Sequence, residues 1–134
     1  RMQTQEIDVL VIGAGPSGCV SASILHQNGL RVLVVEKEKF PRFVIGESLL
    51  PRSMETLENA GFLEVLKTKG FQEKFGAKFI RNSEICDFNF SDQFTQGWNW
   101  TWQVPRADFD QTIAEELQRK GVEILFEHSV QGIV

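Results

Sequence analysis

The pattern that most constrains this chain is a Gly-x-Gly-x-x-Gly motif near its start. The glycines follow an apolar run at residues 7–12 and precede a run with helical spacing, and a second apolar run at 30–35 ends next to the acidic Glu36. This arrangement is typical of a strand, helix and strand in a parallel sheet that binds a dinucleotide. We therefore predict an α/β fold whose first strand is buried on both faces, because helices usually cover both sides of a parallel sheet.

Each glycine of the motif has its own predicted role. Gly13 permits the sharp turn from strand to helix, Gly15 leaves room for a pyrophosphate at the helix N-terminus, and Gly18 lets the helix pack on the strand. Pro16 suits the first helical position, and Asn28-Gly29 ends the helix. The residues that we expect to bind the cofactor here are Gly13, Gly15, Pro16, Ser17 and Gly18.

Glu36 is predicted to bind the hydroxyls of the adenosine ribose, with Lys37 beside it in the same site. A carboxylate at this position would repel a ribose 2′-phosphate, so FAD or NAD is favoured over NADP. The alternative is a strand–helix–strand unit that binds no nucleotide.

Composition narrows the class of protein. The chain has 134 residues, 42% of them hydrophobic, which suffices for one domain or part of one. Its net charge of −4 gives no reason to expect nucleic acid. No signal peptide or membrane-spanning run is recognisable, and we expect a cytoplasmic protein. Cys19 and Cys86 are predicted to be buried free thiols, and we expect no metal site.

The end of the chain predicts a return to the parallel sheet. A helix is expected from about 108 to 120, a strand at 122–127 and the beginning of another at 130–134. Because a doubly wound sheet usually has more strands than this, we expect the chain to be the amino-terminal portion of a larger enzyme.

The middle of the chain follows a different pattern. Residues 40–48 are predicted to form a loop, and two short helices follow, the first at 51–60 with Met54 and Leu57 inward. Alternating apolar residues then occur in three runs, which predict a small antiparallel sheet inserted into the nucleotide-binding domain. The runs lie at 74–79, 85–90 and 98–104. The expected divisions are 1–70 for cofactor binding, 71–105 on the substrate side, and 106–134 for the return to the cofactor domain.

Four segments together carry a family resemblance: the glycine motif, Pro-Arg-Phe-Val-Ile-Gly-Glu-Ser-Leu-Leu-Pro at 41–51, Lys-Phe-Gly-Ala-Lys-Phe at 74–79, and Gln-Val-Pro-Arg-Ala-Asp-Phe-Asp at 103–110. They resemble FAD-dependent oxidoreductases of the p-hydroxybenzoate-hydroxylase fold, above all flavin-dependent halogenases and geranylgeranyl-reductase-like flavoproteins. The resemblance implies a Rossmann-like FAD-binding domain and FAD as the cofactor.

The same resemblance implies contacts to FAD for further residues. They are Arg42, Gly46, Ser48, Arg106 and, beside the adenine, Val130. The implied activity is halogenation or monooxygenation of an organic small molecule, with a flavin reductase or another electron donor as partner. Reduction of a carbon–carbon double bond is an alternative activity. A non-catalytic dinucleotide-binding module is an alternative of another class.

Several of these residues also have a simpler interpretation. Arg42 and Arg106 could be solvated charges, although guanidinium groups bind phosphate oxygens well. Ser48 could be a helix cap. Asp108 and Asp110 are explained by capping and the helix dipole alone. Glu47 is interpreted as a solvated carboxylate, and His26 and His128 receive no role.

Lys74 is the candidate catalytic residue. In halogenases, the motif that resembles residues 74–79 supplies a lysine that presents the halogen of hypohalous acid to an electron-rich ring. The alternative is a lysine that protects an edge strand, and Lys78 on the same face favours that alternative. The segment 100–105 looks like the Trp-x-Trp-x-Ile-Pro motif of halogenases, but that motif lies much further along the chain. We interpret its tryptophans as the apolar face of a strand, a core stripe or the wall of a substrate pocket.

Overall fold

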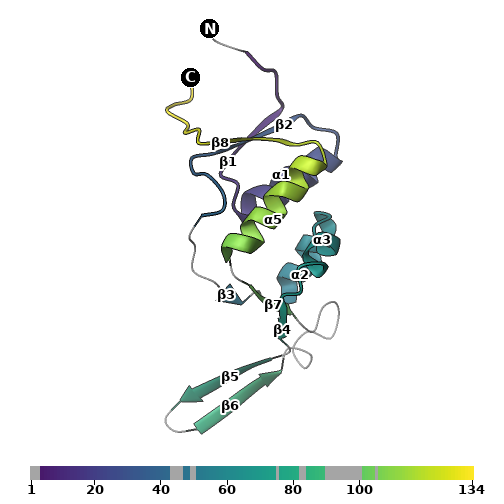
Figure 1. Cartoon of the computed structure of the whole chain (residues 1–134), viewed down its shortest axis with the longest axis vertical. Coiled ribbons are helices and arrows are strands. Elements are labelled where there is room, and N and C mark those ends of the chain that lie inside the picture. Colours follow the sequence, from purple (N-terminus) through teal and green to yellow (C-terminus); the bar gives the residue numbers. More distant parts are fainter. Residues whose placement is uncertain are drawn as a thin grey trace.

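The structure is a computed structural model that describes residues 4–42, 47–48, 51–74, 76–81, 84–89, 101–104 and 106–134. Side chains are described for residues 4–42, 53–71 and 106–134. A parallel sheet and its helices form the upper part of the molecule in Figure 1, close to both termini. Antiparallel strands form the opposite end, where a hairpin projects.

Three parallel strands form the sheet expected from the sequence. They are β1 (Val9–Ile12), β2 (Val32–Glu36) and β8 (Glu123–Phe126), in the order β1-β2-β8. Val9 lies beside Val32, and Leu33 lies beside Glu123. Because β2 is the central strand, all five of its residues are buried.

The expectation that the first strand is buried on both faces is wrong for the part of the chain described here. Val9 and Val11 pack against the core, but Leu10 and Ile12 are 40% and 60% exposed. The described helices α1 (Pro16–Gln27) and α5 (Arg106–Arg119) lie on one side of the sheet. The other face of β1 therefore keeps its apolar side chains accessible.

The predicted helices are confirmed. Helix α1 begins at Pro16 and ends at Gln27; Asn28 is its C-cap, and Gly29 follows in the left-handed conformation with φ of 84°. Helix α5 begins two residues before the expected start. The short helices are α2 (Pro51–Asn59) and α3 (Leu63–Lys67), and Met54 and Leu57 point inward as expected.

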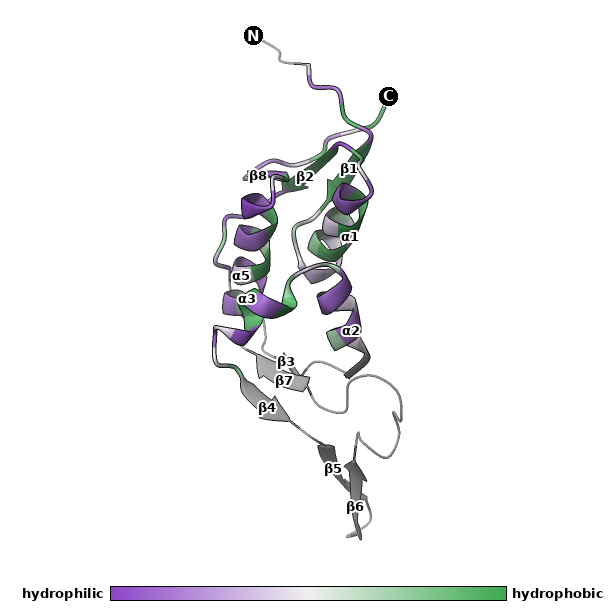
Figure 2. Ribbon diagram, turned by 90° about the vertical axis from the view of Figure 1, so that its right-hand side faces the viewer, coloured by the Kyte–Doolittle hydropathy of each residue, from purple (hydrophilic) through white to green (hydrophobic). Residues whose placement is uncertain are grey.

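The core lies where these helices meet one another and the sheet. In Figure 2 the apolar side of α5 faces α1, and its hydrophilic side is turned away. The largest fully buried side chains are Phe62, Phe109, Met54, Leu66, Ile113 and Leu117. At one edge, Lys120 Nζ donates to the carbonyl oxygens of Ala60 (3.2 Å) and Gly61 (2.7 Å), so a cation lies at the C-terminal end of α2, where the helix dipole favours it.

The antiparallel strands form two sheets, where the sequence predicted one. Strands β3 (Glu47–Ser48), β7 (Thr101–Val104) and β4 (Gln72–Lys74) pair in the order β3-β7-β4. Among the described strands, β5 (Gly76–Arg81) and β6 (Glu84–Asn89) pair with each other alone. Alternation identifies which residues share a face of a strand, but it does not identify the strand's partner.

Two further expectations are corrected. The predicted loop at 40–48 contains β3, whose residues pair with the end of β7. The strand expected at 130–134 is absent from the described chain, and Val130, Ile133 and Val134 are exposed. A short apolar alternation forms a strand only where a neighbouring strand offers hydrogen bonds. Gly46 and the tryptophans at 98 and 100 lie outside the described residues.

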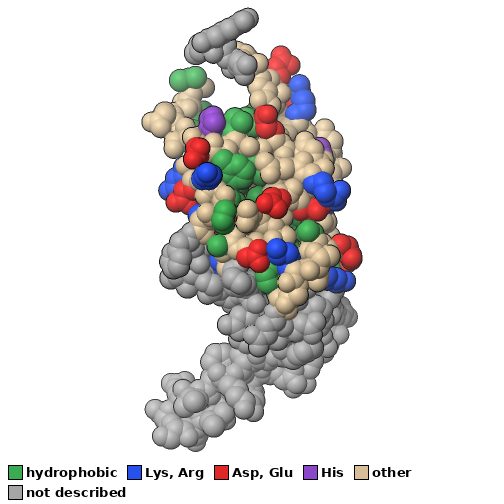
Figure 3. Space-filling view, viewed as in Figure 1, with side chains coloured by type: hydrophobic (Ala, Val, Ile, Leu, Met, Phe, Trp, Pro, Cys, Tyr) green, Lys and Arg blue, Asp and Glu red, His purple; other side chains and the backbone are tan. Residues whose placement is uncertain are grey.

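The surface of the helical part mixes both signs of charge. In Figure 3, basic and acidic side chains are interspersed over the face in view. Within the described ranges, no helix is both long and apolar enough to span a membrane.

Candidate functional site

The turn between β1 and α1 shows why two of its positions require glycine. Gly13 has φ of 102°, a conformation that residues with a Cβ rarely adopt. A Cβ on Gly18 would overlap the carbonyl oxygen of Gly13 and lie 3.4 Å from Cγ1 of Val11. The predicted roles of these two glycines, the sharp turn and the close packing of helix on strand, are therefore confirmed.

Gly15 faces open space that ends at a guanidinium group. A Cβ on Gly15 would lie 3.4 Å from Nη2 of Arg42, which is ordinary van der Waals contact. Gly15 is also the residue before Pro16, the first residue of α1. The backbone N–H groups of this helix end and the positive charge of Arg42 therefore lie beside the same space.

Glu36 ends β2 next to this turn, and its carboxylate is 3% exposed. Oε1 accepts a hydrogen bond from the N–H of Ala14 at 2.8 Å. Oε2 accepts one from the N–H of Glu38 at 2.9 Å and one from Nη1 of Arg42 at 3.3 Å. A carboxylate has about four acceptor positions. Oε1 therefore keeps capacity for a further donor, such as a ribose hydroxyl.

A cavity of about 380 Å³ brings half of the predicted cofactor residues together. It is lined by Ile12, Gly13, Gly15, Val35, Glu36, Lys37, Arg42, His128, Ser129 and Val130. The wall at 128–130 follows β8, and the N–H of His128 donates to the backbone oxygen of Glu36 at 3.0 Å. The structure thus places residues that are about 90 positions apart around one space.

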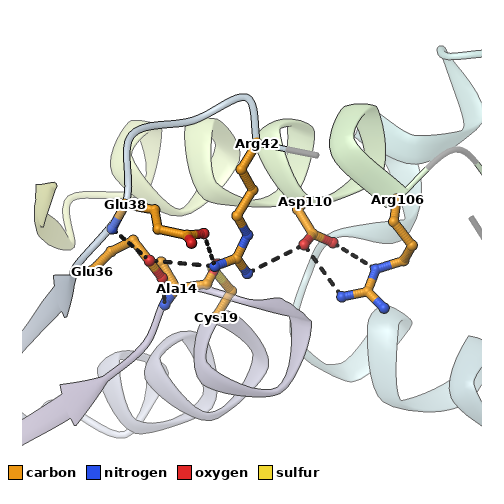
Figure 4. A network of polar contacts seen from close by, with 7 residues as sticks. All are labelled: Ala14, Cys19, Glu36, Glu38, Arg42, Arg106 and Asp110. Carbon is orange, nitrogen blue, oxygen red and sulfur yellow. Dashed lines mark hydrogen bonds and ion pairs between the residues drawn. The ribbon is translucent and has the colours of Figure 1, made fainter. Parts of the chain in front are cut away.

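Arg42 is held by three carboxylates (Figure 4). Its Nη1 donates to Glu36 and, at 3.1 Å, to Glu38, and its Nη2 donates to Asp110 at 3.5 Å. Its guanidinium also lies over the ring of Phe40, 4.7 Å from the centroid. Its Nε is buried and has no partner in the described structure. A buried donor without a partner is costly, and a phosphate oxygen would satisfy it.

Arg106 is the first residue of α5. It lines a second cavity of about 330 Å³, together with Pro16, Ser17, Val20, Ser21, Ser53, Thr56, Leu57 and Phe109. Its Nε donates to Oδ1 of Asp110 at 3.0 Å and its Nη2 donates to Oδ2 at 3.3 Å. The interpretation of Arg42 and Arg106 as solvated loop charges is therefore wrong.

Asp110 is the residue of this site that sequence reasoning missed. It was interpreted as a helix-capping residue, but it is 1% exposed and its carboxylate binds both arginines. The Arg106–Asp110 spacing of four residues was a local signal for an ion pair. The contact to Arg42 spans 68 positions, and no local pattern could indicate it.

Cys19 is buried beneath the same network. Its Sγ lies 3.3 Å from the backbone oxygen of Ala14, to which the thiol donates. Burial raises the pKa of Cys19 to about 12, and the negative charges of Asp110 and Glu36 act in the same direction, while Arg42 opposes them. Cys19 is therefore a protonated, structural thiol, as expected from the sequence.

Three predicted residues lie outside the region with described side chains. Gly46 is not described, and Ser48 and Lys74 are described by their backbone alone. Ser48 lies beside Gln103, and Lys74 lies beside Thr101, so both belong to the sheet β3-β7-β4. Among the residues that the structure describes, no group of three or more His, Cys, Asp or Glu side chains could hold a metal ion.

The comparisons with known proteins agree with this geometry. A family model described as an FAD binding domain matches residues 6–134. A flavin-dependent halogenase of Armillaria mellea is 36% identical over 118 residues, which are 87% of this chain and 23% of the relative. A 1H-pyrrole-2-carbonyl-[peptidyl-carrier protein] brominase of Pseudoalteromonas luteoviolacea is also 36% identical, over 87% of this chain and 27% of its own.

Two solved structures share the fold. A flavoprotein/dehydrogenase of Cytophaga hutchinsonii is 62% identical over 97% of this chain and 32% of its own, with a TM-score of 0.91. The myxobacterial chondrochloren halogenase is 35% identical over 96% of this chain and 30% of its own, with a TM-score of 0.85. The chain spans roughly a quarter to a third of the length of these four relatives. Since the family model covers almost all of its residues, the chain belongs to the FAD-binding domain family, and its cofactor is FAD.

Proposed function

We propose that the whole protein is an FAD-dependent oxidoreductase that acts on an organic small molecule, as a halogenase or a monooxygenase. The observation that carries the proposal is the cavity in which the space at Gly15, the carboxylate of Glu36 and the guanidinium of Arg42 converge. Relatives named as halogenases support the activity. When bound, FAD supplies the redox chemistry, while the protein supplies position, electrostatics and exclusion of water.

Different residues of this chain would bind different parts of FAD. Glu36 accepts hydrogen bonds from the ribose hydroxyls, with Lys37 and Val130 on the adenosine side. The helix end at Gly13, Gly15, Pro16, Ser17 and Gly18 binds the pyrophosphate, whose charge the α1 dipole favours. Arg42 and Arg106 supply guanidinium donors beside the pyrophosphate. Gly46 and Ser48 belong to the flavin side in this proposal.

The substrate would lie beyond the flavin, next to residues 71–105. Residues 1–70 and 106–134 form the cofactor part in the proposed division. Lys74 is the proposed catalytic residue if the reaction is halogenation, because an amine in a partly dry pocket has a lowered pKa and a nucleophilic lone pair. An electron donor, such as a separate flavin reductase, would complete the reaction in the cytoplasm.

The test of the cofactor site is FAD binding by the full-length protein. The parent should bind FAD, and Gly15→Val should weaken binding about tenfold or more, because the new side chain fills the space between the helix end and Arg42. Gly70→Asn is the control for a glycine substitution, because Gly70 lies on an exposed turn, lines neither cavity, and has a left-handed conformation (φ of 68°) that asparagine tolerates. A Gly15→Val protein with the parent's affinity would refute the placement of the pyrophosphate.

A second candidate is a dehydrogenase that transfers hydride and uses no halide. The flavoprotein/dehydrogenase of Cytophaga hutchinsonii favours it, because its identity of 62% exceeds that of the halogenases named above. Turnover of the reduced protein with oxygen and bromide or chloride separates the two. Halogenated or oxygenated product favours the first proposal, and electron transfer that incorporates neither halide nor oxygen favours the second.

A further inference from the structure

We propose that Asp110 is a positioning residue, which holds Arg42 and Arg106 beside the N-terminal end of α1 so that both face the pyrophosphate of FAD. The proposal rests on the proposed function, because it takes the pyrophosphate to lie at Gly15. It adds a residue that contacts neither substrate nor cofactor and acts through the two arginines.

The carboxylate of Asp110 accepts hydrogen bonds from both guanidinium groups. Its Oδ1 accepts from Nε of Arg106 at 3.0 Å. Its Oδ2 accepts from Nη2 of Arg106 at 3.3 Å and from Nη2 of Arg42 at 3.5 Å. Figure 4 shows Asp110 between the arginines, with Arg42 from the loop after β2 and Arg106 from the first turn of α5. One side chain therefore fixes groups from two distant segments.

Burial makes this contact more than a surface ion pair. Asp110 is 1% exposed, and the side chains of Arg42 and Arg106 are 22% and 17% exposed. A buried carboxylate is stable only when it is paired and hydrogen-bonded. The two arginines satisfy Asp110, and in return Asp110 restricts the positions of two side chains that would otherwise sample many rotamers.

Arg42 keeps a donor for a ligand while it is held. Guanidinium has five N–H donors. Arg42 uses Nη1 and Nη2 for carboxylates, while its buried Nε has no partner among the described residues. Its Nη2 also lies over the space at Gly15. Arg42 is thus oriented by acidic residues and still able to donate to a phosphate oxygen.

The two cavities show where the side chains of the two arginines face. Arg42 lines the cavity that contains Gly13 and Gly15, and Arg106 lines the cavity that contains Pro16 and Ser17. Both cavities therefore adjoin the N-terminal end of α1. A pyrophosphate bound at this helix end would lie beside both arginines, and Asp110 sets the distance between them.

The test is Asp110→Asn in the full-length apoprotein, with FAD affinity measured by the change in flavin fluorescence. The substitution keeps the shape and removes the charge that orients both arginines. We expect the dissociation constant to rise about tenfold or more. Asp108→Asn is the matched control, because Asp108 lies in the same helical turn, is half-exposed and pairs with Lys69 instead. The control should change affinity less than about twofold.

A double-mutant cycle separates positioning from general stability. If Asp110 acts through the arginines, Asp110→Asn should have almost no further effect on FAD affinity in an Arg42→Met/Arg106→Met protein. If its role is merely structural, the full loss should persist in that background. Urea unfolding of each apoprotein gives the independent check that the compared variants are folded.

Unchanged FAD binding by folded Asp110→Asn would overturn the proposal, because it would show that the charge orients nothing that FAD needs. Tighter binding would overturn it too, because it would show that the charge repels the phosphates. If Asp110→Asn does not fold, Asp110→Glu replaces it. Glutamate keeps the charge and moves the carboxylate by one methylene, so FAD binding should still weaken, and the parent's affinity would overturn the proposal. A parent protein without FAD affinity would refute the proposed function instead.

Discussion

Glu36 combines two tasks that one carboxylate can perform only because it is buried at the end of β2. It fixes the glycine turn through the N–H of Ala14, and it presents an acceptor to the cavity. Glu36→Gln should raise the dissociation constant of FAD about tenfold, because a hydrogen bond to a charged acceptor contributes roughly 1.5–3 kcal/mol. The isosteric amide keeps the packing, and Glu58→Gln on the exposed side of α2 is the control. Calorimetric titration with FAD measures the change, and equal affinities would remove Glu36 from the ribose site.

Cys19 gives a prediction on pH. Its pKa is raised from 9.0 to about 12 in the folded protein, so the unfolded chain loses its proton first as pH rises. The contribution of this thiol to stability is therefore complete below pH 9 and is lost as the pH approaches 12. In a variant whose other cysteines are serine, iodoacetamide at pH 8 should modify Cys19 only as fast as the protein opens. Rapid modification of the folded protein would contradict the assigned burial and pKa.

The role of a single residue could be predicted from the sequence where its contacts are to residues of the same strand–helix–strand unit. Gly13, Gly18 and Glu36 were predictable, because the turn, the close packing and the strand end belong to one strand–helix–strand unit. The role of Asp110 was not predictable, because its contact to Arg42 exists only after α5 has packed beside the loop that follows β2.

At the scale of elements, the close packing of α1 on β1 leaves no room for a side chain at Gly18. Gly18→Ala should destabilise the protein by roughly 1–3 kcal/mol, as overpacking in a core does, because the methyl group would overlap the backbone of Gly13. Ser21→Ala, on the exposed side of the same helix, should change stability by less than about 0.5 kcal/mol. Urea unfolding of the apoproteins compares the two. A Gly18→Ala protein as stable as the parent would show that α1 does not pack closely on β1.

Helix boundaries were predictable because each helix here carries its own start and stop residues. Pro16 begins α1, Gly29 follows its end, and Gly61 with φ of 82° separates α2 from α3. Strand partners were not predictable. The pairing of β3 with β7 joins residues 47–48 to 103–104. Alternation suggested that the runs at 74–79, 85–90 and 98–104 share one sheet, but among the described strands β5 pairs with β6, and β7 belongs to another sheet.

At the scale of the whole molecule, the proposed cofactor site lies on the side of the helical part that adjoins the antiparallel strands. The glycine turn and the start of α5 point towards the end of the molecule that holds β3, β7 and β4 (Figure 1). Strand β4 ends at Lys74 and pairs with β7, whose last residue, Val104, precedes Arg106 by two positions. The backbone that carries the proposed catalytic lysine is thus connected to the backbone that carries a proposed FAD ligand.

This connection makes Lys74 the residue that separates the candidate activities. If the protein halogenates, Lys74→Ala should reduce halogenated product to background and leave FAD affinity and the oxidation of reduced flavin by oxygen nearly unchanged, because the lysine acts after oxygen has reacted. If it hydroxylates or transfers hydride, turnover should change only modestly. Lys78→Ala in β5 is the control for loss of a strand lysine. The measurement is a single turnover of reduced full-length enzyme with oxygen, bromide or chloride, and an electron-rich aromatic compound. Full yield from Lys74→Ala would eliminate the catalytic lysine, and the absence of halogenated product from the parent across many such compounds would favour the monooxygenase or the dehydrogenase.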